Sequence, residues 1–200
     1  MTTPAKIRIL IAEDHLMVRS GLIMALESYP DMQVVGEAGN GVDAVRLCEE
    51  LRPDVVLMDV RMPKMDGVAA TRLIHQTMPH IRIVILTSFL DPEVVQEAVQ
   101  AGATGFLLKD ASLDDLAAAI SAAFLGQTSF SADMLRMLVE AATGSIDPIN
   151  GLSDTERQVL GLLHKGMKGP EITERMQMTN SELDALVSSI VYKMRTNSAG

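Results

Sequence analysis

The 200-residue sequence has one cysteine, Cys48, and no tryptophan, and aromatic residues make up only 3% of it. A single cysteine excludes an internal disulfide framework and a zinc site built from several cysteines. The few aromatic residues argue against a surface that stacks nucleic-acid bases on rings. The sequence also lacks an apolar run of the roughly 18 residues that a membrane-spanning helix needs, and its first residues carry no secretory cleavage signal. We therefore expect a cytoplasmic protein that does not associate with membranes.

Positive charge is scarce as well. The sequence has 17 basic and 26 acidic residues, a formal net charge of −9, and 48% apolar residues. This composition is typical of a folded globular protein, and the acidic excess argues against a general affinity for nucleic acid. The excess is uneven, because residues 151–200 hold six basic and six acidic residues. A small carboxyl-terminal domain can therefore differ from the rest in what it binds.

The first 128 residues alternate between two patterns. Short apolar runs, many of them β-branched, predict strands at residues 7–12, 33–36, 55–58, 83–86 and 105–108. Helical periodicity follows each run, near residues 16–28, 41–51, 67–77, 93–101 and 113–125. Five strands that alternate with five helices predict a doubly wound α/β domain, with a five-stranded parallel sheet covered on both faces.

The remainder of the chain predicts a small all-α domain. One helix is expected over 131–143, followed by a turn-forming linker and three short helices at about 153–165, 168–176 and 179–194. Ser153 and Glu156 have the spacing of a capping box at the start of the first of these helices. We divide the chain into an α/β domain (1–128), a linker helix and loop (129–150) and a helical domain (151–200).

Polar residues follow four of the predicted strands. Glu13 and Asp14 come after the first, Asp59 after the third, Thr87 after the fourth and Lys109 after the fifth. Acids that merely cap helices would explain any one of these positions, but the carboxyl ends of parallel strands meet at one edge, where function gathers. Clustered carboxylates need a cation, and oxygen ligands suit Mg²⁺. A carboxylate can also attack phosphorus, while the lysine and the hydroxyl stabilise the phosphoryl oxygens.

These positions fall in four segments that carry a resemblance to a known family, at residues 9–15, 54–67, 84–88 and 102–110. Their order and spacing resemble those of two-component response regulators of the NarL/FixJ (LuxR-type) class. The resemblance implies a receiver domain in which a sensor histidine kinase phosphorylates Asp59. It also implies Mg²⁺ held by Glu13, Asp14, Asp59 and the backbone carbonyl of Arg61.

The resemblance implies further roles around the same site. Thr87 would be the switch hydroxyl, Phe106 the switch aromatic residue and Lys109 the lysine that pairs with the phosphoryl group, while Pro63 and Gly67 shape the adjacent loop. The phosphoryl charge would draw Thr87 inward, and Phe106 would turn into the vacated space. We expect a phosphoacceptor and a phosphorylation-dependent homodimer, and we do not expect an enzyme that turns over an external metabolite.

Residues 152–194 resemble the helix-turn-helix output domain of the same class, whose third helix lies in the major groove of DNA. Relatives usually carry lysine, threonine, lysine and histidine on the groove-facing side, but this chain has Ser181, Glu182, Asp184 and Leu186 there. The fourth helix of the family would be short or missing before Gly200. If the domain binds duplex DNA, the candidate contacts are Lys165, Lys168, Arg175, Ser181, Glu182, Lys193 and Arg195. The alternative is a domain that has lost DNA binding and works through protein contacts, which Leu186 favours.

Two other classes of protein fit the residues less well. A phosphatase of the haloacid-dehalogenase type usually has a second aspartate two residues after the nucleophile, where this chain has Arg61. A flavin- or nucleotide-binding domain would have a glycine-rich first loop to hold phosphate, whereas this chain has Glu13, Asp14 and His15. We therefore interpret the chain as a response regulator that couples the state of its receiver domain to transcription.

Overall fold

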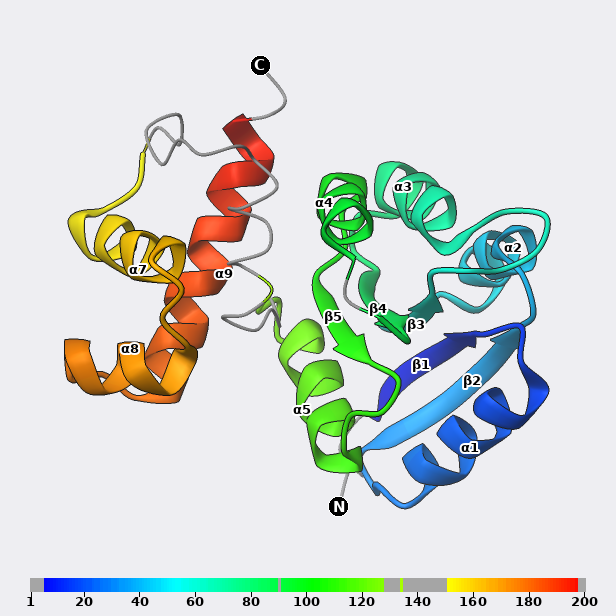
Figure 1. Cartoon of the computed structure of the whole chain (residues 1–200). Coiled ribbons are helices and arrows are strands. Elements are labelled where there is room, and N and C mark those ends of the chain that lie inside the picture. Colours follow the sequence, from blue (N-terminus) through cyan, green and yellow to red (C-terminus); the bar gives the residue numbers. More distant parts are fainter. Residues whose placement is uncertain (1–5, 90, 128–133, 135–150, 198–200) are drawn as a thin grey trace.

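The protein is described from a computed structural model, which covers residues 6–89, 91–127, 134 and 151–197 (Figure 1). The first part contains a five-stranded parallel sheet with strand order β2-β1-β3-β4-β5. Its strands are β1 (Ile7–Ala12), β2 (Met32–Ala38), β3 (Val55–Asp59), β4 (Arg82–Thr87) and β5 (Gly105–Leu108). Its helices are α1 (Leu16–Glu27), α2 (Gly41–Leu51), α3 (Gly67–Thr77), α4 (Pro92–Ala101) and α5 (Leu113–Phe124). The predicted α/β architecture is confirmed, and β2 is longer than predicted at both ends.

The centre of the sheet is buried on both faces because β1, β3 and β4 are mostly apolar. In β1, Ile9 and Ile11 face α1 and α5, whereas Leu10 and Ala12 lie on the side of α2, α3 and α4. Every residue of β3 is buried. A continuous apolar strand of this kind can lie only inside a sheet covered by helices on both sides, as Figure 1 shows.

The strand order places the functional edge of the sheet. The chain runs outward from β1 to β2 and then returns to the other side of β1 to form β3. Such a reversal opens a crevice beyond the carboxyl ends of the two central strands. Ala12, at the end of β1, pairs with Met58 of β3, so the residues that follow these strands emerge side by side at the crevice.

The second part is a three-helix unit made of α7 (Asp154–His164), α8 (Gly169–Met176) and α9 (Asn180–Asn197). Its core is formed by apolar side chains from all three helices, which are Val159, Leu160, Leu163, Ile172, Leu183, Val187, Ile190 and Val191. Gly166 has a positive φ of 82° just after α7, which is a conformation that glycine adopts at low cost. The predicted boundaries of these helices agree with the structure to within about three residues. The helix predicted over 131–143 lies outside the described residues, except for Met134, which is buried.

A buried ionic group joins the first and last helices of this unit. Ser153 and Glu156 form the predicted capping box, in which the Ser153 hydroxyl accepts from the Glu156 N–H and the Glu156 carboxylate accepts from the Ser153 N–H. The same carboxylate, only 3% exposed, also accepts from the Ser189 hydroxyl at 2.6 Å and pairs with Lys193 Nζ at 2.7 Å. Because Ser189 and Lys193 belong to α9, this one carboxylate fixes α9 against α7.

No helix in the described parts of the chain is long and apolar enough to cross a membrane.

Candidate functional site

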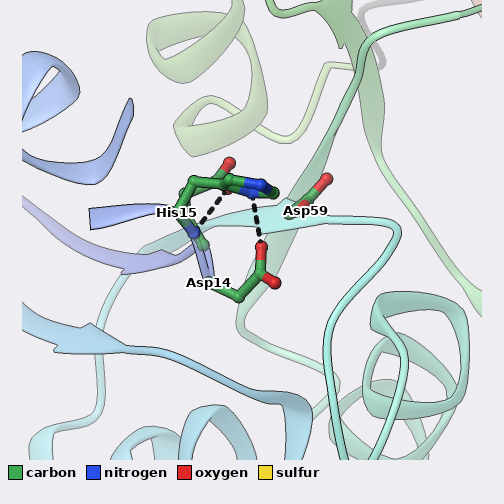
Figure 2. A group of neighbouring side chains, drawn as sticks. Asp14, His15 and Asp59 are labelled. Atoms are coloured by element: carbon green, nitrogen blue, oxygen red, sulfur yellow. Dashed lines mark hydrogen bonds and ion pairs between the residues drawn. The ribbon is translucent and has the colours of Figure 1, made fainter. Parts of the chain in front are cut away.

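Three carboxylates meet at the crevice between β1 and β3. Glu13 and Asp14 directly follow β1, and Asp59 is the last residue of β3. Each of these side chains, and that of His15, offers one ligand atom, and these atoms all lie within 4.8 Å of one another (Figure 2). Glu13 and Asp59 are buried, whereas the Asp14 side chain is 30% exposed. The sheet therefore brings the three predicted acids into one cluster, which is open to solvent on the Asp14 side.

Lys109 closes the cluster from the side of β5. Its Nζ lies 2.6 Å from Oε2 of Glu13 and 2.9 Å from Oδ1 of Asp59. The lysine follows β5, and its N–H donates to the Thr87 carbonyl oxygen, which continues the pairing of β5 with β4. One ammonium group thus neutralises part of the charge of two buried carboxylates.

Burial and charge both shift the pKa values of this group. Burial raises the pKa of Asp59 above its ordinary value, against the opposing hydrogen bond from Lys109, and the neighbouring Glu13 charge raises it further. Burial alone would lower the pKa of Lys109, but its hydrogen bonds to Glu13 and Asp59 leave it raised. The lysine is therefore firmly protonated, and Asp59 carries its negative charge at a cost.

The loop between β3 and α3 is tightly fitted around the Asp59 backbone. The Gly67 N–H donates to the Val60 carbonyl oxygen at 2.8 Å. A Cβ atom on Gly67 would lie 1.9 Å from the Asp59 carbonyl oxygen, a distance at which the two atoms overlap. In the same loop Lys64 has a positive φ of 66°. The loop-shaping role that the resemblance implies for Gly67 thus has a direct steric cause.

Thr87 is the last residue of β4, and Phe106 lies in β5, the strand that Lys109 follows. The Thr87 hydroxyl donates to the Phe89 carbonyl oxygen at 2.9 Å, within its own loop after β4. Phe106 is only 4% exposed and packs in the core on the α4 side of the sheet. The Phe106 ring therefore already points inward in this structure. Its rotation on phosphorylation stays a prediction.

Two residues that the sequence analysis did not assign to the site also contact it. Arg19 donates to the Glu13 carbonyl oxygen, and its Nε lies 3.1 Å from Oε2 of Glu37. The Nδ1 atom of His15 lies 2.8 Å from Oδ1 of Asp14 and 3.3 Å from Oε1 of Glu13. The signal for Arg19 was a lone cation in a largely apolar helix, four residues after His15 and close to the acids.

An open cleft of about 530 Å³ lies beside the cluster, between the β3–α3 loop and α4. Its lining includes Asp14 from the cluster, Arg61 and Pro63 from the loop, and Val94 and Glu97 from α4. The cleft gives a reactant access to the side of the cluster on which Asp14 is exposed.

The candidate DNA contacts of the second part fall into two groups. Lys165, Lys168, Arg175 and Ser181 are exposed. Glu182, which is also exposed, and Lys193, which is half-buried, have their charged groups engaged within the unit. The Glu182 carboxylate accepts from the Thr179 N–H and hydroxyl at 2.7 and 2.9 Å, which lowers its pKa, and Lys193 pairs with Glu156. The side chains of Asp184 and Arg195 lie outside the described part of the structure.

Leu186 makes a core contact that the sequence analysis did not predict. It is half-buried and packs against the apolar core, and its place on the groove-facing side of the third helix stays a prediction. Its apolar character is therefore explained by packing. The observation that favoured loss of DNA binding no longer does so.

The comparisons with known proteins agree with this architecture. A family model described as the response regulator receiver domain matches residues 9–121. The transcriptional regulatory protein LiaR from Bacillus subtilis is 36% identical over 191 residues, which cover 94% of this chain and 90% of LiaR. The DNA-binding transcriptional activator DevR/DosR from Mycobacterium tuberculosis is 34% identical over 191 residues, or 94% of this chain and 88% of DevR/DosR.

A similar structure has also been solved. The crystal structure of a LuxR-family two-component response regulator from Aurantimonas sp. SI85-9A1 superposes with a TM-score of 0.64 at 34% identity, covering 70% of this chain and all of that one. With a five-stranded receiver fold, an acid cluster at the crevice and relatives that match nearly its whole length, the chain belongs to the response regulator family.

Proposed function

We propose that this protein is a phosphorylation-controlled transcriptional regulator, in which Asp59 accepts a phosphoryl group from a sensor histidine kinase and the helical unit binds duplex DNA. The observation that carries the proposal is the position of the Asp59 carboxylate, at the carboxyl end of β3 with Lys109 Nζ 2.9 Å from its Oδ1. The names of the relatives, which include transcriptional regulators over the same length, support the output.

The residues at the crevice fit a bound Mg²⁺ ion. Three carboxylates face one lysine within the cluster, which leaves two negative charges for a divalent cation to balance. Glu13, Asp14, Asp59 and the backbone carbonyl of Arg61 would hold the ion. When bound, Mg²⁺ neutralises phosphoryl oxygens and helps to orient the donor.

The protein's own groups would carry the transfer as follows. A carboxylate oxygen of Asp59 attacks phosphorus and forms an O–P bond, while the P–N bond to the donor's histidine breaks and its electron pair returns to that imidazole. Lys109 stays protonated and stabilises a phosphoryl oxygen. The Thr87 hydroxyl exchanges its bond to the Phe89 carbonyl for a bond to another phosphoryl oxygen.

The fold offers a path from this event to the output. Movement of Thr87 pulls on the loop that leads into α4, and α9 lies beside α4 (Figure 1). A shift of α4 therefore changes the surface that α9 contacts. We propose that phosphorylation frees α9 in this way and that two phosphorylated copies then bind DNA as a homodimer. The only reactions at the site would be transfer of the phosphoryl group to Asp59 and the later loss of that group.

The Asp59 assignment is tested with acetyl phosphate and Mg²⁺. Asp59→Asn should abolish labelling and the binding of beryllofluoride. Asp66→Asn is the matched control, because Asp66 caps α3 in the same loop through the Ala69 N–H and asparagine caps equally well. Undiminished labelling of Asp59→Asn would overturn the assignment.

The output is tested with the full-length protein activated by beryllofluoride. It is titrated onto random duplex DNA at about 50 and 200 mM salt, where phosphate contacts produce a steep loss of affinity. Steep salt dependence and enrichment of a recurring sequence are expected. If folded and activated protein does not bind at the lower salt concentration, the DNA-binding output is wrong.

A further inference from the structure

We infer that His15 is an additional ligand of the metal site. With this imidazole ligand, the site favours transition-metal ions over Mg²⁺ more strongly than a site made of its oxygen ligands alone. This inference rests on the metal site of the proposed function. The chemical class of ligand is a divalent ion that accepts imidazole nitrogen, such as Mn²⁺, Co²⁺ or Ni²⁺.

The position of the His15 ring carries the inference. Its Nδ1 atom lies 2.8 Å from Oδ1 of Asp14 and 3.3 Å from Oε1 of Glu13. Neighbouring ligands in an octahedral site with bonds of about 2.1 Å lie about 3.0 Å apart. The imidazole nitrogen and the two carboxylate oxygens therefore have the spacing of adjacent ligands around one ion, and Figure 2 shows the ring facing Asp14.

The His15 ring does not cap α1, the helix that it precedes, so capping does not compete with metal binding. His15 is the N-cap residue of α1, but its side chain makes no capping hydrogen bond. Its backbone N–H instead donates to Oε1 of Glu13 at 3.1 Å, which holds the glutamate and the ring on the same side of the turn. The side chain is 72% exposed, so an incoming ion can reach Nδ1 without any opening of the core.

Ligand chemistry decides which ions benefit. Mg²⁺ prefers oxygen ligands and keeps several waters, so it would leave the His15 ring beside the acids without a bond to the ion. A transition-metal ion would displace the Nδ1 proton to solvent and bind the nitrogen directly. His15 should therefore add affinity for Mn²⁺, Co²⁺ and Ni²⁺ and little for Mg²⁺.

His15→Asn is the test variant, because asparagine is a good N-cap residue and keeps the start of α1. Isothermal titration calorimetry of the full-length protein with MgCl₂ and with NiCl₂ should show Ni²⁺ affinity reduced by about tenfold or more, while Mg²⁺ affinity changes less than about twofold. His80→Asn is the matched control, since His80 is exposed and lies before β4, at the opposite end of the sheet.

A second measurement detects the bond itself. The Co²⁺-loaded protein should show a contact-shifted imidazole N–H signal in its proton NMR spectrum, which is absent from His15→Asn and retained in His80→Asn. Equal loss of Ni²⁺ and Mg²⁺ affinity, no loss of Ni²⁺ affinity, or a shifted signal that persists in His15→Asn would overturn the role of His15. Failure of the wild-type protein to bind Mg²⁺ would instead count against the metal site of the proposed function.

Discussion

Asp59 is held in the folded protein at some cost to stability. Its pKa is raised by burial and by Glu13, so the ionised carboxylate is less stable in the folded state than in the unfolded chain. A raised pKa of an acid means that stability falls as the pH rises through that pKa. In metal-free protein near pH 7, Asp59→Asn should therefore raise the melting temperature, by about 2–4 °C for each kcal/mol relieved.

The measurement is thermal unfolding in EDTA, followed by circular dichroism. Asp54→Asn serves as the control, because the Asp54 carboxylate lies outside the cluster and accepts from the Arg8 N–H. Added Mg²⁺ should stabilise the wild type but not Asp59→Asn, and so narrow the difference between them. A lower melting temperature for Asp59→Asn in EDTA would contradict the expectation that the buried, ionised Asp59 destabilises the folded protein.

Gly67 is the residue through which the loop fits around Asp59. In Gly67→Ala the new Cβ atom would start 1.9 Å from the Asp59 carbonyl oxygen, so the loop or the end of β3 must move. We expect a loss of about 1–3 kcal/mol in the free energy of unfolding and slower labelling by acetyl phosphate, because Asp59 moves with its backbone. Urea denaturation and labelling kinetics measure the two effects.

Gly21→Ala is the control for this substitution. Gly21 lies within α1, and a Cβ atom there would meet nothing within 4 Å. Alanine should therefore stabilise this helix by about 0.5–1 kcal/mol. Opposite signs for the two glycines are the expected result, and equal, small effects would show that the loop adapts without cost.

At the scale of the elements, the pairing of α7 with α9 depends on an ionised Glu156. Burial would raise its pKa, but hydrogen bonds from Lys193, Ser189 and Ser153 lower the pKa to about 2. Since this value lies below that of the unfolded chain, the stabilisation is present above about pH 4.5 and is lost as the pH falls toward 2. Glu156→Gln should cost about 2–4 kcal/mol at neutral pH and less at pH 3.

Melting of the full-length protein at pH 7 and at the lowest pH where it remains folded tests this expectation. Glu171→Gln is the comparison, because Glu171 accepts from the Lys168 N–H at the start of α8 but is exposed. It should lose well under 1 kcal/mol. A loss at Glu156 that does not depend on pH would mean that packing, and not charge, joins the two helices.

The elements also show how far the sequence predicts the structure. Turn residues and apolar periodicity located the sheet and its helices, and strand ends brought Glu13, Asp14, Asp59 and Lys109 together, because these are consequences of local pattern and parallel topology. The ion pair between Glu156 and Lys193 was not predicted, since it joins residues 37 apart on different helices. The core contact of Leu186 was not predicted either, because it depends on how α9 packs against other elements of the chain.

Across the whole molecule, the negative charge is concentrated in the receiver domain, whereas the helical unit is nearly neutral. The net charge of −9 opposes DNA, so binding must rest on a few exposed cations in the helical unit. Lys165 and Lys168 are exposed beside the turn between α7 and α8, whereas the Lys193 ammonium lies 2.7 Å from Glu156. The structure therefore separates cations that can meet phosphate from one that holds the unit together.

The salt dependence of DNA binding distinguishes these two roles. Each lost phosphate contact lowers the slope of log K against log salt by about 0.9. We expect Lys165→Gln and Lys168→Gln to reduce the slope by about this amount with little change in melting temperature. Lys193→Gln should lower the melting temperature and leave the slope unchanged when binding is measured well below that temperature. If Lys193→Gln reduces the slope and spares stability, Lys193 exchanges Glu156 for phosphate in the complex, and α9 meets DNA through the residue that in the free protein holds it to α7.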